Sequence, residues 1–161
     1  MHLVPYALDR GLSETFSVSL IGLIGVGSVV GRFVMGGIAD RIGRRLGLGL
    51  TFVGMGAMLL LWLAANGPVL LIAFALLFGT FYGGYVALIP ALTADYFSGR
   101  NVSGIIGFLY TGAGIGALAG LAFDLSGSYA LPIAAGAAAN LIAIACIAPI
   151  AEPVHFRAGM R

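Results

Sequence analysis

The sequence contains no lysine, one cysteine and little charge of either sign, and each shortage excludes a class of protein. Charged residues make up 9% of the chain, whereas soluble domains carry about a quarter. The eight basic residues are all arginine and the net charge is +2, so the chain lacks the basic patch that binds nucleic acid. Cys146 stands alone, which excludes an internal disulfide. We expect no metal site and no cofactor.

What the chain has instead is apolar sequence. Apolar residues make up 60% of it, and the mean hydropathy of +1.07 indicates lipid as the solvent. A spanning helix needs about 20 apolar residues, and five segments qualify: 16–38, 46–65, 69–94, 102–123 and 129–150. These segments are too long for strands and lack the alternation of a barrel. We predict an all-α, polytopic transmembrane helix bundle, forming a single transmembrane domain over residues 1–161.

The N-terminal residues predict a further, incomplete helix. Residues 2–8 resemble the last two turns of a helix whose beginning is missing, because they are too few to cross a bilayer. Ser13, followed by Glu14, is a suitable cap for the next helix, which is the first complete span. Gly, Asn, Ser or Pro follows each later span, as turns between helices require.

The arginines predict the orientation in the membrane. One side of the predicted bundle carries Arg41, Arg44, Arg45, Arg100, Arg157 and Arg161, whereas the other carries Arg10. Short loops that are rich in arginine remain in the cytoplasm. We therefore expect the chain to start outside and to end in the cytoplasm, in the plasma (inner) membrane.

Two loop patterns carry a family resemblance. The first, Gly-x-x-x-Asp-Arg-x-Gly-Arg-Arg, is formed by Gly36, Asp40, Arg41, Gly43, Arg44 and Arg45. It resembles a loop signature of the major facilitator superfamily. The second includes Pro90, Asp95, Arg100 and Asn101. It is similar to the connection between the tenth and eleventh helices of the monocarboxylate and oxalate–formate transporters.

The resemblance implies the C-terminal half of a twelve-helix carrier. Such carriers move a small solute by alternating access, here an organic anion such as a monocarboxylate, as an antiporter or symporter. The chain resembles less than a whole carrier. It is therefore expected to be a truncated product, a fragment, or one part of an assembly with an N-terminal half or a second copy. The alternative is a non-transporting membrane fragment or helix-packing partner. An intramembrane enzyme is disfavoured, because no span contains a Ser/His, Asp/Asp or His-x-x-x-His pair.

Arg32 is the sharpest candidate for substrate binding. An arginine inside a span costs on the order of 2–3 kcal/mol, and its neighbours Gly25, Ser28 and Gly36 form a small, polar stripe that predicts a bundle-facing side. The resemblance implies that an arginine at this position holds the substrate carboxylate. The alternative is that Arg32 extends to the headgroups. Proton-linked members have an Asp where this chain has Ser28, which argues against proton coupling through that pair.

Other polar or small residues are assigned by their depth and spacing. Tyr82 and Asn140 lie within spans and need partners or water, so we expect them to line the substrate cavity or to pack between helices. Small residues recur every four positions in two spans, which predicts close helix packing; they are Gly79, Gly83, Gly112, Gly116 and Gly120. The resemblance implies a conformational role for the loop around Asp40. For Asp95, a solvated helix end is the simpler interpretation.

Overall fold

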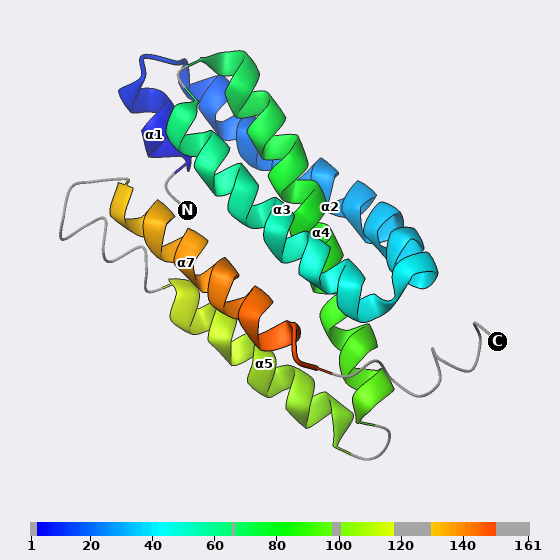
Figure 1. Cartoon of the computed structure of the whole chain (residues 1–161). Helices are drawn as coiled ribbons and strands as arrows, with labels where there is room; N and C mark the ends of the chain where they lie inside the picture. The colour runs from blue at the N-terminus through cyan, green and yellow to red at the C-terminus, as the bar shows by residue number, and fades with distance from the viewer. Residues whose placement is uncertain (1–2, 66, 98–100, 118–129, 151–161) are drawn as a thin grey trace.

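The computed structural model describes residues 3–65, 67–97, 101–117 and 130–150, with backbone alone at 113–117 and 130–131. Over these residues the chain folds into six helices and no strand. The helices are α1 (Leu3–Asp9), α2 (Glu14–Ile42), α3 (Arg44–Ala64), α4 (Pro68–Tyr96), α5 (Val102–Ala117) and α7 (Ala130–Ile147) (Figure 1). The predicted all-α fold class is confirmed.

Three of these helices, α2, α3 and α4, are long and apolar enough to cross a membrane. They correspond to the predicted spans 16–38, 46–65 and 69–94. Shorter apolar stretches, Val102–Gly112 in α5 and Pro132–Ile147 in α7, correspond to the last two predicted spans. The connection predicted between those two spans falls on residues outside the described ones. The described helices form a partial transmembrane bundle.

The connection between α2 and α3 is shorter than predicted. The sequence indicated a loop over Asp40–Arg45, but α2 continues to Ile42 and α3 begins at Arg44. Gly43 alone separates them, with φ 98°, a backbone angle that favours glycine. Its N–H still donates to the Ala39 carbonyl at 2.8 Å. The first pattern is therefore mostly helical, because one glycine suffices for the turn.

At the end of the bundle far from Gly43, side chains form hydrogen bonds with backbone groups at the helix ends. Ser13 accepts a bond from the Phe16 N–H at 3.3 Å, so the predicted cap is confirmed. In α1, the Tyr6 hydroxyl donates to the Ala65 carbonyl at 3.0 Å. Tyr6 thereby satisfies a carbonyl at the end of α3 that has no partner within that helix. The Tyr6 bond holds α1 against the bundle, and α1 lies beside the start of α2 (Figure 1).

The most extensive contact is between α2 and α4, which run parallel. Gly79 lies against the backbone of Ile24, and Gly83 lies against the backbone of Ser28. Gly27 and Gly31 approach α4 in the same way. Because a Cβ at any of these four positions would overlap the facing helix, glycine is what permits the two backbones to meet.

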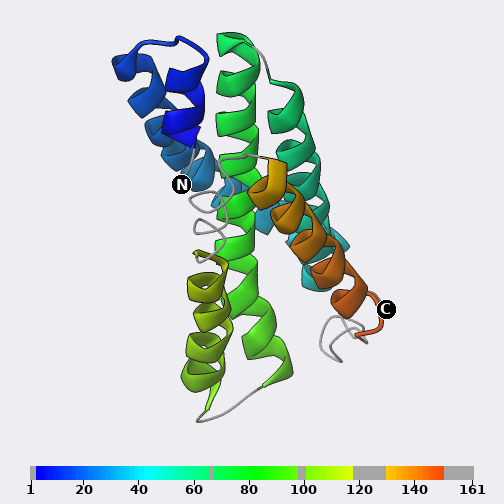
Figure 2. The same cartoon turned by 90° about the vertical axis from the view of Figure 1, so that its left-hand side faces the viewer.

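The remaining helices pack on either side of this pair. α3 runs antiparallel to α4, with Gly54 against the Phe81 ring, and α7 packs on the other side of α3. α5 touches α4 over a smaller area. The helices α5 and α7 overlap in Figure 1 but lie far apart in Figure 2, where α5 lies beside the end of α4.

Candidate functional site

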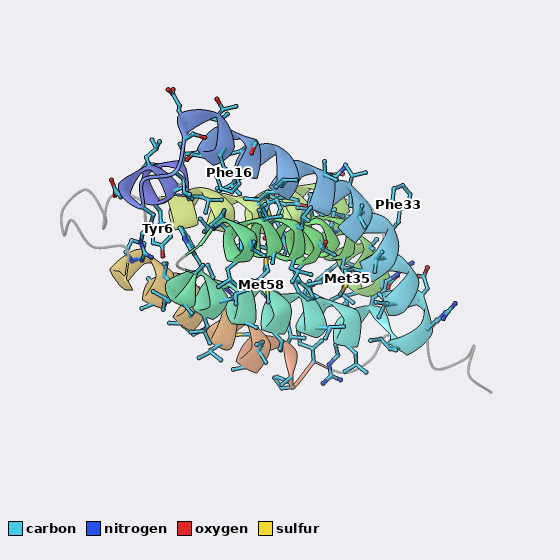
Figure 3. The ribbon with its side chains drawn as sticks, turned by 90° about the horizontal axis from the view of Figure 1, so that it is seen from above. Tyr6, Phe16, Phe33, Met35 and Met58 are labelled. Atoms are coloured by element: carbon cyan, nitrogen blue, oxygen red, sulfur yellow. The ribbon has the colours of Figure 1, made fainter. Side chains whose placement is uncertain are left out.

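Arg32 lies deep in α2 and is exposed. The helix continues for ten residues to Ile42, so Arg32 lies about 15 Å from that end. Within the described residues no helix covers its side chain. Its neighbour Phe33 is 78% exposed and points away from the bundle, whereas Met35 is buried among the helices (Figure 3). The cation therefore stands on an open flank of α2.

The residues of the stripe predicted around Arg32 differ in burial. Ser28 is buried, and its carbonyl lies against Gly83 of α4. Gly25 is exposed, and neither Gly25 nor Gly36 has an atom near the position of a Cβ. The described helices thus bury one residue of the stripe, and the prediction that the whole stripe faces the interior of a complete bundle stays a prediction. Ser28 packs inwards, because the α2–α4 contact runs past it, while Arg32 and Gly25 remain uncovered.

Tyr82 belongs to an aromatic surface of α4. Its ring lies 6.1 Å from that of Tyr85 and 6.4 Å from that of Phe78. Tyr82 is 44% exposed. Tyr85 also contacts the Phe52 ring of α3 at 5.6 Å. This face can offer flat apolar surface and a phenolic hydroxyl to a ligand.

Asn140 lies between α7 and α3. Its amide Nδ2 donates to the Gly136 carbonyl within α7 at 2.8 Å, and its Cβ lies beside Gly56 of α3. The Oδ1 atom is buried and has no partner among the described residues. A buried acceptor of this kind requires water or another donor. The surroundings of Asn140 are those of a helix contact.

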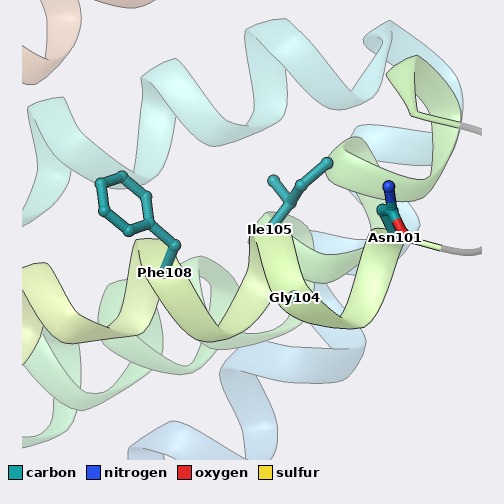
Figure 4. Close-up of a pocket in the computed structure, with 4 residues that line it drawn as sticks. All are labelled: Asn101, Gly104, Ile105 and Phe108. Atoms are coloured by element: carbon teal, nitrogen blue, oxygen red, sulfur yellow. The ribbon is translucent and has the colours of Figure 1, made fainter.

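The four predicted substrate-binding residues do not meet in the described residues. Ser28 is enclosed between α2 and α4, and Asn140 lies between α3 and α7, while Arg32 and Tyr82 are exposed on different helices. A separate hollow of about 480 Å³ lies along the start of α5. Asn101, Gly104, Ile105 and Phe108 line it (Figure 4). Of these, Asn101 belongs to the second loop pattern.

Pro90 leaves a carbonyl of α4 free to accept a hydrogen bond from α5. A proline has no N–H, so the carbonyl four residues before it, here Val86, loses its helical partner. The Tyr110 hydroxyl of α5 donates to that carbonyl at 3.2 Å. In lipid a neighbouring helix must satisfy such a group. Tyr110 therefore joins α5 to α4 at the point where α4 lacks one of its backbone hydrogen bonds.

The two loop patterns are joined by an ion pair. Arg44 Nη1 lies 2.7 Å from Asp95 Oδ1, and Nη1 also donates to the Ala91 carbonyl at 3.4 Å. Arg44 begins α3 and Asp95 is in the last turn of α4, so each charge lies at the unfavourable end of its own helix dipole. Pairing offsets both effects. Asp95 thus lies at a helix end and is partly exposed, as expected, and it also pairs with Arg44.

Arg45 connects the first loop pattern to α7. Its Nε donates to the Ile147 carbonyl at 3.2 Å, and Nη2 donates to the Ala148 carbonyl. A cation at a helix C-terminus is favourable, and these two carbonyls lie at the last residue of α7 and directly after it. Arg44 and Arg45, adjacent in sequence, thus tie α3 to α4 and to α7 at one end of the bundle.

The other predicted loop residues are at the surface or at helix ends. Asp40 and Arg41 are exposed in the last turns of α2, and Gly36 is half-buried. The Asn101 carbonyl accepts the Ile105 N–H at the start of α5. Arg100 lies outside the described residues.

The predicted glycine rows have different surroundings. Gly79 and Gly83 lie against α2, as described above. A Cβ at Gly112 would meet no described atom. Gly116 is within α5, where only the backbone is described, and Gly120 lies outside the described residues.

Sequence reasoning missed three residues of these contacts. Gly27 and Gly31, which face α4, have the same four-residue spacing as Gly79 and Gly83, so the signal was present. Tyr110 was noticeable only as a tyrosine within a span, but Pro90 marks a carbonyl that needs a donor.

The sequence matches the family model of the Major Facilitator Superfamily over residues 1–157. The chain therefore belongs to this superfamily of membrane proteins, and it is an integral membrane protein.

Individual relatives narrow the comparison. The chain is 33% identical to monocarboxylate transporter 12-B of Danio rerio over 114 residues, which are 68% of this chain and 24% of that protein. It is 32% identical to monocarboxylate transporter 12 of Homo sapiens over 138 residues, 80% of this chain and 27% of that protein. An MFS-type transporter of Gibberella moniliformis is 32% identical over 119 residues, 73% of this chain and 29% of that protein. The chain thus spans about a quarter of the length of these relatives. No solved structure matches it significantly.

Proposed function

We propose that the chain is part of a secondary-active carrier that moves a small organic anion, such as a monocarboxylate, by alternating access. Membership of the superfamily and similarity to monocarboxylate transporters support transport of a small solute. The chain forms one transmembrane domain of the carrier and requires further helices, from an N-terminal half or a second copy, to enclose a path. The ends near Gly43, where Arg41, Arg44 and Arg45 gather, face the cytoplasm.

The observation that carries the choice of an anion is the uncovered Arg32. A guanidinium at this depth in an apolar helix is costly unless it meets a ligand, water or another helix. Its planar fork suits a carboxylate, which it can bind through two parallel bonds. Tyr82 contributes a hydroxyl and a flat surface on the neighbouring α4. Ser28 and Asn140 pack between helices and are left out of the proposed contact set.

The Arg44–Asp95 pair supports a conformational role for the loop patterns. It joins α3 to α4 where both helices end, and Arg45 adds α7. Such a cluster holds the cytoplasmic ends together in one state and must rearrange if those ends separate. The role proposed for the cluster is to bias the carrier between its two states, without contact to substrate.

The test is uptake of labelled carboxylates into proteoliposomes that contain this chain with a co-expressed chain carrying the remaining helices. Replacing Arg32 with Ala removes a charge-assisted contact, so KM is expected to rise about 10- to 150-fold. Arg32→Lys keeps the charge and recovers part of the affinity. Phe33→Ala is the matched control, since Phe33 is the exposed neighbour of Arg32 that points away from the bundle.

Two outcomes would contradict the proposal. Substrate affinity that is unchanged in Arg32→Ala would exclude the anion role and favour an extension of Arg32 to the headgroups. Absence of uptake with every partner chain, despite correct insertion, would favour the alternative of a non-transporting, helix-packing fragment.

A further inference from the structure

A second cavity lies between α3 and α7, away from Arg32 and Tyr82. It is a groove of about 430 Å³ at the end of the bundle near Gly43, within the range of roughly 300–1,000 Å³ for ligand pockets. Leu46, Gly49, Leu50 and Val53 of α3 line one wall, and Ile144 of α7 belongs to the other. The lining is aliphatic along the length of the groove.

One end of the groove carries a charge. Arg45 is the one charged residue in the described lining, and it lies where α3 begins and α7 ends. Its bonds to the Ile147 and Ala148 carbonyls hold the guanidinium in place. They use two of its five N–H donors, so donors remain for a ligand at the mouth of the groove.

The groove opens on an exposed apolar face of the described helices. Leu46 is 55% exposed and Val53 is 52% exposed. A Cβ at Gly49 would meet no atom within 4 Å, so the missing side chain leaves room along the floor. An apolar channel with one cation at its end matches an amphipathic molecule that has a long tail and an anionic head. A small, fully hydrated anion does not match it.

We propose that this groove binds an anionic phospholipid, with one acyl chain along α3 and the phosphate paired with Arg45. Acyl chains fit the aliphatic walls, and the net negative headgroup fits the fixed cation better than a zwitterionic headgroup does. One arginine near the surface accounts for a preference of about fivefold. The site does not depend on transport, and Arg32 has no part in it.

The experiment uses the full chain with a tryptophan placed in the groove. Trp62 is the sole tryptophan, and its ring packs against Tyr6 at the opposite end of α3. A Trp62→Phe, Val53→Trp protein therefore reports on the groove alone. In vesicles that contain trace brominated lipid, brominated phosphatidylglycerol is expected to quench its fluorescence at about one fifth of the concentration that brominated phosphatidylcholine requires.

Substitutions distinguish lipid binding in the groove from a general attraction of anionic lipid to the arginines of the chain. Arg45→Gln is expected to abolish the preference, whereas Arg41→Gln, which removes an exposed charge of the same pattern, is expected to retain it. Gly49→Phe fills the groove while leaving Arg45 in place, and it is expected to weaken quenching by both lipids. A tryptophan at Val34, which is 46% exposed on α2 and lies at a similar distance from Gly43, provides the matched lipid-facing control.

Several results would overturn the proposal. Equal quenching by the two lipids at Val53→Trp would show ordinary lipid contact. A preference that survives Arg45→Gln, or one of the same size at Val34→Trp, would show that Arg45 does not select the lipid. Absence of quenching by either lipid would show that protein covers the groove. Because the readout is binding, failure of the transport proposal would leave each of these results interpretable.

Discussion

The helix α4 holds two of its neighbours, α2 and α5, in different ways. Against α2 it packs backbone to backbone, through Gly79 and Gly83, over the most extensive contact in the described residues. Against α5 it has a smaller contact, which includes the bond from the Tyr110 hydroxyl to the Val86 carbonyl. The first contact is distributed along the helix, and the second is concentrated near Pro90.

The difference indicates which parts of the bundle can move independently. Separating α2 from α4 loses many van der Waals contacts at once, which is the main source of helix association in lipid. Separating α5 from α4 loses fewer contacts and leaves one carbonyl without a donor. We therefore expect α2 and α4 to act as one body and α5 to change its position more easily. Three further experiments test how α4 is held by its neighbours.

The largest effect is expected from Gly83→Ala. The added Cβ would overlap the Ser28 carbonyl, so α2 and α4 must move apart. We expect a loss of about 3 kcal/mol in the free energy of unfolding, at the upper end of the usual cost of overpacking, because the added Cβ meets backbone atoms that cannot change rotamer. Equilibrium unfolding in mixed micelles measures it.

The matched control for that change is Gly25→Ala. It adds the same methyl group to α2, at a position where a Cβ meets no atom. If Gly83→Ala and Gly25→Ala unfold at the same denaturant concentration, the backbone contact of α2 with α4 is not what stabilises the bundle.

A smaller effect, confined to α5, is expected from Tyr110→Phe. The change removes the donor to Val86 and keeps the ring, at a cost of about 1 kcal/mol. Amide exchange over Val102–Gly112 is expected to accelerate about fivefold, while exchange in α2 and the first half of α4 stays unchanged. Tyr82→Phe, at a more exposed tyrosine of α4, is the control. Faster exchange throughout α2 as well would contradict the distinction between the two contacts.

The smallest effect is expected at the ion pair of Arg44 and Asp95. Both side chains are partly exposed, at 38% and 30%, so the pair is worth about 0.2–1 kcal/mol after solvent screening. A double-mutant cycle with Arg44→Gln and Asp95→Asn measures the coupling energy. It is expected to fall further at high salt. A coupling energy of zero at low salt would remove this pair from the cluster that joins α3 to α4.

Much of the fold was predictable because a helix that spans a membrane must be a long, mostly apolar segment. Long apolar runs gave α2, α3 and α4 to within a few residues, and Ser13 gave the start of α2. The spacing of Gly79 and Gly83 predicted a close helix contact. It did not identify the partner helix, because small residues recur in several spans and spacing alone does not choose between them.

The candidate site was less predictable, because it depends on which helix faces cover one another. Ser28 and Arg32 are one turn apart, yet α4 buries the first and leaves the second exposed. The pairing of Arg44 with Asp95 joins residues 51 positions apart. Their charges at the unfavourable ends of α3 and α4 hinted that each needed a partner, but only the packing of the two helices brings them together.

The glycine-to-backbone contact between α2 and α4 also has a mechanical consequence. A side chain between two helices can absorb a displacement by changing rotamer, and at Gly27, Gly31, Gly79 and Gly83 there is none to do so. We therefore expect a displacement of α2 near Arg32 to move α4 with it. Pro90, where α4 lacks one backbone hydrogen bond, lies seven residues beyond the contact at Gly83.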